Sequence, residues 1–278
     1  MPLVFVPTPL GNLRDITLRA LDVLRECTLL VAEDSRVARK LLAALELPGK
    51  EIRSYREQNA RTATNPILER ARREIVAVVA DAGMPGISDP GAELVAAARA
   101  AGVAVDVLPG PNAALGAAVL SGFPMHRFVF EGFPPRSSSA RRASFNRALE
   151  LGIPSIWYES PNRIRASLRD LASVDPSARV FLLREYTKRF EEQLHGTAAQ
   201  IEAKLGERVR GEISFVVMPS PPAPARPPST REIDEQIDTL LASSHSVSSV
   251  AKTLAARGYG ERQAIYARAG KRKRSRRE

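Results

Sequence analysis

The sequence predicts an α/β protein made of two α/β domains and a small carboxyl-terminal helical unit, and three observations support this prediction. Up to Gly122, short apolar runs alternate with helical patterns, which is typical of a mostly parallel sheet covered by helices. Between residues 123 and 219 the apolar runs are shorter and closer together, which predicts a mixed sheet. Beyond a proline-rich segment the hydrophobic period is helical throughout.

The predicted elements follow in chain order. In the first domain the expected strands are LVFVP, LLVAED, a run near Ile52, IVAVVAD and VAVDVLP, with helices from Thr17, Val37 and Ala92. In the second domain they are RFVFEGF, SIWYES, RVFLLREY, EEQLHGT and GEISFVVM, with helical stretches from Arg142, Arg163 and Ala198. The predicted parts are the parallel domain 1–122, the mixed domain 123–219, the proline-rich linker 220–230, the helical domain 231–270 and the basic tail 271–278.

Composition indicates a soluble protein of the cytoplasm. A chain of 278 residues with 44% hydrophobic content can bury a sizeable core. No apolar run approaches the ~20 residues that span a bilayer, and the first residues lack the features of a secretory signal, so we expect no membrane association. The single cysteine, Cys27, has no partner for a disulfide or a zinc site, and we expect it to fill space in the core.

The charge of the chain favours a polyanionic partner. The formal net charge is +10, and the segment from Arg226 to Glu278 holds 12 Lys and Arg against 6 Asp and Glu, which is +6 of that total. The tail KRKRSRRE from Lys271 is either a solvated, disordered tail or a phosphate contact. The preceding helix, glycine turn and helix have the layout of an αα-hairpin or helix-turn-helix, for which packing or RNA contact is favoured over DNA recognition.

Three apolar runs open directly into Gly/Pro loops: VFVPTPLGN, IVAVVADAGMPGISDPG and VAVDVLPGPNAALGA. In an open α/β sheet, ligands bind beyond the carboxyl ends of the strands, where glycine lets the backbone come close. The three loops therefore predict one shared ligand site. None of them has the phosphate-binding pattern of dinucleotide enzymes or P-loop NTPases, which favours a ligand without a pyrophosphate.

Individual residues of these loops have both structural and functional interpretations. We expect Asp89 to cap the helix after Pro90, and Gly83 and Met84 to lie close to the ligand. Asn112 precedes a run of small helix formers and is expected to be an N-cap, with nearby backbone N–H groups directed at a carboxylate of the ligand.

Charged clusters follow other strands. VAEDSR holds Glu33, Asp34 and Arg36, which suit either proton transfer or a plain ion pair. YESPNR and REYTKRFEE repeat this theme in the second domain and are expected to face the first across a cleft. The three histidines share no metal-ligand spacing, and no G-x-S-x-G motif occurs, so metal and serine-hydrolase chemistry are disfavoured.

Eight segments together resemble, in order and spacing, the tetrapyrrole-methylase superfamily of class III methyltransferases: TPLGNLRDITLRAL, AEDSR, DAGMPGISDPG, LPGPNA, SGFP, EGFPPR, YESPNR and REYTKRFEE. Within it they resemble the RsmI-type branch, which uses S-adenosylmethionine to methylate the ribose 2′-hydroxyl of a cytidine in 16S rRNA of the small ribosomal subunit. The resemblance implies two α/β domains with this cofactor between them, and a homodimer.

The resemblance also implies site residues. The methionine and ribose of the cofactor are expected at Pro9, Leu10, Asp81, Gly83, Met84, Ile87, Pro111, Asn112 and Ala113. The adenine is expected at Tyr158, Glu159 and Leu182. The family often has Thr at the position of Met84 and Ser at that of Asn112, and neither difference removes a backbone contact.

Methyl transfer requires the ribose oxygen to be aligned and to lose its proton. Asp34, Glu185, or Lys188 with a lowered pKa are the candidate proton acceptors, and the sequence does not rank them. Phosphate contacts are expected from Arg36, Arg136, Arg141, Arg163 and Lys188, around a single-stranded cytidine. Two alternatives stay open: methylation of a tetrapyrrole or other small acceptor, and a non-catalytic RNA-binding assembly factor.

Overall fold

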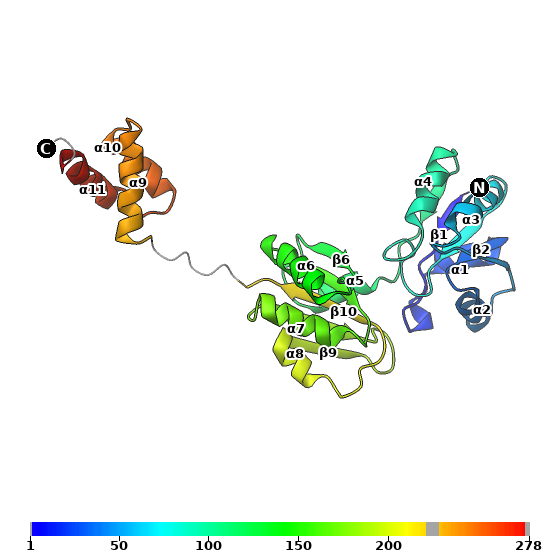
Figure 1. Cartoon of the computed structure of the whole chain (residues 1–278). Coiled ribbons are helices and arrows are strands. Elements are labelled where there is room, and N and C mark those ends of the chain that lie inside the picture. The colour runs from blue at the N-terminus through cyan, green and yellow to red at the C-terminus, as the bar shows by residue number, and fades with distance from the viewer. Residues whose placement is uncertain (1, 221–227, 276–278) are drawn as a thin grey trace. The chain divides into compact units, whose positions relative to one another are not determined.

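The chain folds into two compact units, Met1–Ser220 and Pro221–Glu278, which are described separately (Figure 1). The computed structural model describes residues 2–220 and 228–275. Most of the linker predicted at 220–230 and the last three residues of the predicted tail lie outside the described residues.

The first unit contains two five-stranded sheets, of which the first is parallel throughout. Its strand order is β3-β2-β4-β1-β5. The strands are β1 (Leu3–Phe5), β2 (Leu29–Ala32), β3 (Glu51–Ser54), β4 (Val76–Val79) and β5 (Val105–Val107). The connecting segments are the 3-10 turn η1 (Leu13–Asp15) and the helices α1 (Leu18–Glu26), α2 (Ser35–Ala44), α3 (Ala60–Ala71) and α4 (Ala92–Ala100).

Both faces of this sheet are covered, which explains why its three inner strands β1, β2 and β4 are apolar and buried at every position. Leu3 and Phe5 face one core, which α3 and α4 complete. Val4 and Val6 face the other core, which α1 and α2 complete and which contains Cys27. Cys27 is 1% exposed, so the prediction that it fills core space is confirmed.

The second sheet is mixed, as predicted, with the order β6-β7-β10-β8-β9. Strands β6 and β7 are parallel and the other neighbours antiparallel. The strands are β6 (Val129–Gly132), β7 (Ser155–Glu159), β8 (Arg179–Arg184), β9 (Glu192–Thr197) and β10 (Ile213–Met218). The helices α6 (Ser138–Glu150), α7 (Ile164–Val174) and α8 (Ala198–Lys204) cover one face, over a core that contains Phe145, Trp157 and Phe215.

The other face of the second sheet is covered by α5 (Ala113–Leu120). Ala114, Ala117 and Ala118 pack there against Ile156 and Phe181. The sequence prediction counts this segment with residues 1–122. The structure instead shows that α5 starts at the first sheet and covers the second. The predicted α/β fold class is confirmed.

The second unit is a three-helix arrangement of α9 (Thr230–Ala242), α10 (Val247–Ala256) and α11 (Arg262–Ser275) around Ile237, Val250, Leu254 and Ile265. The predicted basic tail is helical from Lys271 to Ser275, where it continues α11. Arg272 pairs there with Asp234 and Asp238 of α9, and Arg268 pairs with Asp234. Part of the basic charge therefore holds this unit together.

Across residues 2–220 and 228–275, none of the helices has the length and apolar content needed to cross a bilayer.

Candidate functional site

The three Gly/Pro loops meet at Gly83. The main chains of Thr8 and Gly83 exchange two hydrogen bonds, with N···O distances of 2.9 and 3.0 Å. Gly83 has a φ of 78°, and a Cβ built on it would lie 2.9 Å from Leu10 Cδ2 and 3.7 Å from the carbonyl oxygen of Pro111. Glycine is favoured here because any other residue would have a strained backbone, and its Cβ would have to displace the end of the Leu10 side chain.

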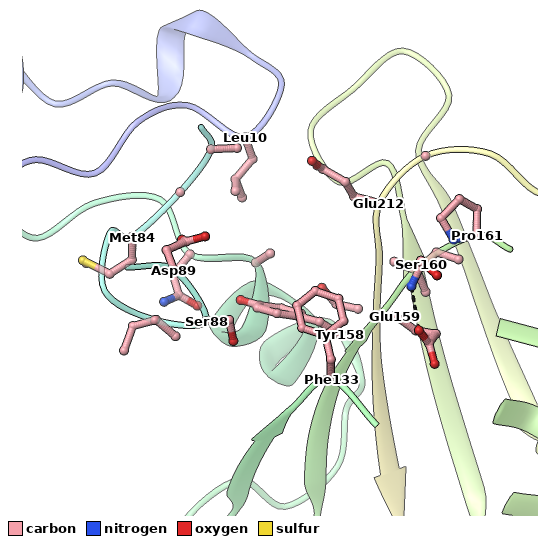
Figure 2. Close-up of a pocket in the computed structure, with 18 residues that line it drawn as sticks. Leu10, Met84, Ser88, Asp89, Phe133, Tyr158, Glu159, Ser160, Pro161 and Glu212 are labelled. Atoms are coloured by element: carbon pink, nitrogen blue, oxygen red, sulfur yellow. Dashed lines mark hydrogen bonds between the residues drawn. The ribbon is translucent and has the colours of Figure 1, made fainter. Parts of the chain in front are cut away.

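A pocket of about 330 Å³ opens beside these loops and is lined from both halves of the first unit (Figure 2). The first half contributes Leu10, Ala82, Gly83, Met84, Ile87, Ser88, Asp89, Asn112 and Ala113, and the second contributes Phe133, Tyr158, Glu159, Ser160, Pro161, Gly211, Glu212, Ile213 and Ser214.

Most of the residues predicted to bind a cofactor line this pocket. They are Leu10, Gly83, Met84, Ile87, Asn112, Ala113, Tyr158 and Glu159. Pro9, Asp81 and Pro111 lie in the same loops but not on the pocket wall, and the carboxylate of Asp81 accepts a hydrogen bond from Asp34 N at 3.2 Å. Leu182, which was expected near the adenine, is 0% exposed within the core of the second sheet and does not line the pocket.

The start of α5 forms one end of the pocket. Asn112 is its N-cap, as predicted, and Oδ1 accepts a hydrogen bond from Leu115 N at 3.0 Å. The first backbone N–H groups of a helix have no partner within the helix, and the helix dipole is positive there. Because Asn112 and Ala113 both line the pocket, this end suits a carboxylate.

Asp89 lies on the pocket wall and does not cap α4, which corrects the prediction made from the sequence. The N-cap of α4 is Gly91, and no side chain caps that helix. Burial is the main cause that raises the pKa of Asp89 to about 6, and the carboxylates of Glu33, Asp81 and Glu212 add to the effect.

A charged cluster in the second half reaches the pocket through Glu212. Lys188 Nζ lies 2.9 Å from Glu185 Oε1 and 3.0 Å from Glu212 Oε2. Burial alone would lower the pKa of Lys188, but hydrogen bonds to these two carboxylates outweigh it and raise that pKa. The hypothesis that Lys188 is a base with a lowered pKa is therefore wrong.

Glu185 and Asp34, the other two predicted proton acceptors, are both bound to cations. Burial would raise the pKa of Glu185, but its hydrogen bonds to Lys188 and to the backbone of Glu212 lower it. Asp34 is the N-cap of α2, and hydrogen bonds from the Arg36 side chain and backbone hold its pKa far below the usual range. Neither carboxylate lines the pocket.

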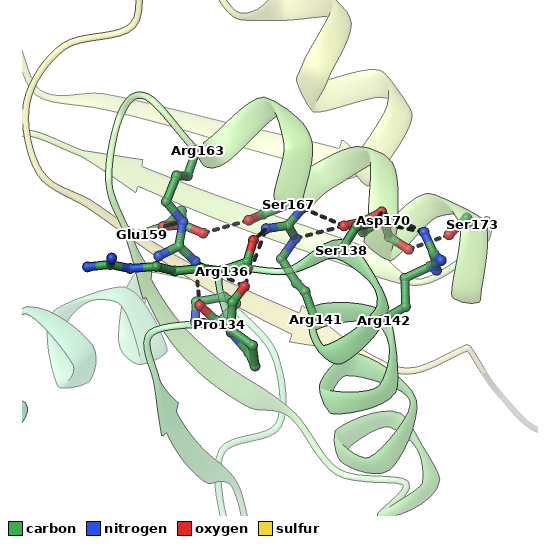
Figure 3. A network of polar contacts seen from close by, with 11 residues as sticks. Pro134, Arg136, Ser138, Arg141, Arg142, Glu159, Arg163, Ser167, Asp170 and Ser173 are labelled. Atoms are coloured by element: carbon green, nitrogen blue, oxygen red, sulfur yellow. Dashed lines mark hydrogen bonds and ion pairs between the residues drawn. The ribbon is translucent and has the colours of Figure 1, made fainter.

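The five cations predicted to contact phosphate differ in accessibility. Arg136 is exposed, and the side chain of Arg36 is 80% exposed while it pairs with Asp34. Arg141 is 5% exposed and bound to Asp170, so it is not available to RNA (Figure 3). Arg163 and Lys188 are partly buried and paired with carboxylates.

Arg141 and Arg163 instead hold the loop after β6. Arg163 Nη2 donates to the carbonyl of Pro134, and Arg141 Nη1 donates to those of Pro135 and Arg136 at 3.3 and 3.1 Å (Figure 3). The carboxylate of Glu159 is in turn held by Arg163 and Ser167. This loop places Phe133 on the pocket wall, beside the ring of Tyr158 at a centroid distance of 5.7 Å.

Comparison with known proteins identifies the family. The family model described as "Tetrapyrrole (Corrin/Porphyrin) Methylases" matches residues 2–202. The chain belongs to the tetrapyrrole methylase family. All pocket residues from Leu10 to Pro161 lie within this match, and the second compact unit lies beyond it.

Relatives within the tetrapyrrole methylase family narrow the match to the branch predicted from the sequence. A protein of Neisseria meningitidis serogroup B called "Ribosomal RNA small subunit methyltransferase I" is 40% identical over 78% of this chain and 76% of its own. A protein of the same name from Thermotoga maritima is 39% identical over 77% of this chain and 97% of its own. One from Bacillus subtilis is 35% identical over 87% of this chain and 82% of its own.

Two solved structures share the fold of the first unit at low sequence identity. Diphthine synthase gives a TM-score of 0.62 at 15% identity and covers 79% of this chain and 90% of its own. Uroporphyrin-III C-methyl transferase from Thermus thermophilus, solved with S-adenosyl homocysteine, gives a TM-score of 0.55 at 19% identity, over 78% of this chain and 97% of its own. These likenesses establish the fold of the first unit.

Proposed function

We propose that this chain transfers a methyl group from S-adenosylmethionine to 16S rRNA of the small ribosomal subunit, at the ribose 2′-hydroxyl of a cytidine. The observation that carries the proposal is the identity of about 40%, over more than three quarters of the chain, to proteins named ribosomal RNA small subunit methyltransferase I. Action on ribosomal subunits fits a protein of the cytoplasm.

The pocket has the chemistry that S-adenosylmethionine needs. This cofactor supplies a methyl carbon bound to a positively charged sulfur, and it carries a carboxylate but no pyrophosphate. Asn112 and Ala113 at the start of α5 would hold the carboxylate, and Gly83 lets the main chain approach closely. Leu10, Met84 and Ile87 supply apolar contacts, and Tyr158 offers a ring for the adenine.

RNA is the acceptor that the exposed groups around the pocket favour. Phe133 lines the pocket with 54% of its surface exposed, and aromatic rings of this kind stack on single-stranded bases. Arg136 is exposed three residues after Phe133, and Arg36 is exposed shortly after the end of β2. The net charge of the chain is +10.

The experiment is transfer of labelled methyl from S-adenosylmethionine to small ribosomal subunits that lack the modification, followed by nucleoside analysis. We expect label in 2′-O-methylcytidine. Label in a base or in another nucleoside contradicts the proposed acceptor atom. Cofactor binding without any labelled RNA supports the small-acceptor alternative. Absence of cofactor binding refutes the proposed methyltransferase activity.

We also propose that the first unit forms a homodimer through exposed apolar side chains of α5 and of the segment before β6. Val119 is 80% exposed, Leu115 53% and Phe128 39%. Such a group of exposed apolar side chains is typical of an interface between protein chains. Light scattering is expected to give twice the chain mass, and Val119→Glu is expected to give the monomer mass.

A further inference from the structure

Asp89 differs from Glu159 and Glu212, the other two carboxylates that line the pocket, because no cation among the described residues pairs with it. Glu212 lies on the opposite wall of the pocket (Figure 2) and is paired with Lys188. Glu159 is held by Arg163, and Asp34 by Arg36. Within residues 2–220 and 228–275, no hydrogen bond or ion pair involves the carboxylate of Asp89.

The position of Asp89 is fixed by its backbone. Ser88 before it has a φ of 62°, and Pro90 after it has its φ fixed by the ring. Gly91 packs so closely on Phe5 that a Cβ would lie 2.9 Å from Phe5 Cε1. The loop is therefore anchored on the first sheet, and it presents the carboxylate to the pocket wall without support from a salt bridge.

The groups that face Asp89 are all acidic or neutral. Glu33 follows β2 and lines with Asp89 a second, small cavity beneath the loop, together with Tyr55. Asp81 follows β4, and Glu212 precedes β10. Burial and these three carboxylates raise the pKa of Asp89 to about 6, so at neutral pH it is ionised and still a better base than an ordinary carboxylate.

We propose that Asp89 accepts the proton of the ribose 2′-hydroxyl during methyl transfer. In this step the ribose oxygen forms a bond to the methyl carbon as the bond from that carbon to sulfur breaks, and the electron pair leaves with the sulfur as a neutral thioether. The O–H bond breaks at the same stage, and the proton passes to the Asp89 carboxylate and then to water. This assignment rests on the proposed function, and it replaces Asp34, Glu185 and Lys188 in the role of base.

The test compares Asp89→Asn with Asp22→Asn, a control at an exposed carboxylate of α1, in labelled methyl transfer to small ribosomal subunits. We expect Asp89→Asn to lower kcat about 100-fold or more, within the range for loss of a general base. Its affinity for S-adenosylhomocysteine, measured by calorimetry, is expected to stay within about threefold of wild type, as for the control.

The pH profile separates a base from a structural residue. In the wild type, log kcat is expected to rise with pH up to about 6 and then level off, because the ionised carboxylate is the active form. Glu33→Gln removes a neighbouring negative charge, which lowers the pKa of Asp89 and moves this rise to lower pH. Asp89→Asn is expected to lose the rise.

Three outcomes overturn the assignment. Activity of Asp89→Asn within threefold of wild type excludes Asp89 as the general base. A parallel loss of cofactor affinity would mean that Asp89 binds the cofactor instead. A wild-type enzyme that labels no RNA refutes the proposed function, and the assignment falls with it. Wild-type labelling with an active Asp89→Asn refutes the assignment alone.

Discussion

Arg141 and Asp170 form a buried ion pair in which one carboxylate oxygen lies 2.7 Å from Nε and 2.6 Å from Nη2 of the arginine. The pair joins α6 to α7. The same guanidinium also donates to two carbonyl oxygens of the loop that places Phe133 in the pocket. A cation that the sequence suggests for RNA binding is thus part of the support of the site.

Removal of Asp170 is expected to destabilise the first unit. Asp170→Ala leaves the Arg141 guanidinium buried without its counter-charge, and we expect the free energy of unfolding to fall by about 3 kcal/mol. Arg142→Ala removes the exposed partner of the same carboxylate and is expected to cost less than about 1 kcal/mol. Urea denaturation measures both, and equal costs for the two variants would contradict a buried structural pair.

Arg136 is expected to contact phosphate, since it is exposed on the loop that Arg141 supports. Arg136→Gln should weaken RNA binding and reduce the slope of log affinity against log salt by about 1. Arg25→Gln changes an exposed arginine on α1 and should leave the slope unchanged. Filter binding over a salt series gives both slopes, and an unchanged slope for Arg136→Gln removes this residue from the interface.

Gly83 is expected to tolerate no side chain. Gly83→Ala combines a φ of 78° with a contact of 2.9 Å to Leu10 Cδ2, which would displace the Leu10 side chain on the pocket wall and lower cofactor affinity at least about tenfold. Gly102→Ala also has a positive φ, 66°, but its Cβ would meet no atom within 4 Å. Calorimetry with S-adenosylhomocysteine should find near-normal affinity in that control, and equal losses in both variants would show that the contact with Leu10 is irrelevant.

Phe133→Ala is expected to raise KM for RNA about tenfold, because stacking on one aromatic ring contributes about 1–3 kcal/mol per base. The affinity for the cofactor should change little. Phe190→Ala removes a ring that is 66% exposed but lies outside the pocket, and it serves as the control. A normal KM for Phe133→Ala would mean that the acceptor base binds elsewhere.

Asp89→Asn is expected to increase stability above pH 6. The pKa of Asp89 is raised in the folded protein from 3.8 to about 6, so ionisation costs stability as pH rises through that window. The asparagine variant avoids this cost, which is about 1 kcal/mol at pH 7 after allowance for solvent screening. Thermal melts at pH 4 and pH 7 should show a difference only at pH 7; a variant less stable at both would indicate a structural role for the carboxylate.

The fold was predictable from the sequence because each sheet leaves a simple pattern. Strands buried on both faces, such as β2 and β4, are continuously apolar, and the Gly/Pro loops mark where the strands end. The convergence of the three loops followed from the parallel arrangement alone. The sequence could not predict which sheet α5 covers, because a helix of mainly small residues can pack on either sheet.

The roles of charged residues were less predictable, because they depend on which partners the fold supplies. Arg136 and Arg141 are alike in the sequence, yet one is exposed and the other is buried against Asp170, 29 positions later. Asp89 has the spacing of an N-cap, and only the structure shows Gly91 in that place. Phe133 was not predicted as a site residue. Its position between Gly and Pro in the EGFPPR motif was the sequence feature that could have indicated its place on the pocket wall.

Helix α5 begins among the residues of the pocket and runs beneath the second sheet, where Tyr186 packs against Gly116. Eight residues of helix are stiff, so any shift of the second sheet against the first moves Asn112 and Ala113 as well. A molecule bound to Asn112 and Ala113 would therefore restrict the movement of the second sheet relative to the first. Binding of such a molecule would therefore slow amide hydrogen exchange in strands β7 and β10. These strands pack against α5 and reach the pocket only at their ends.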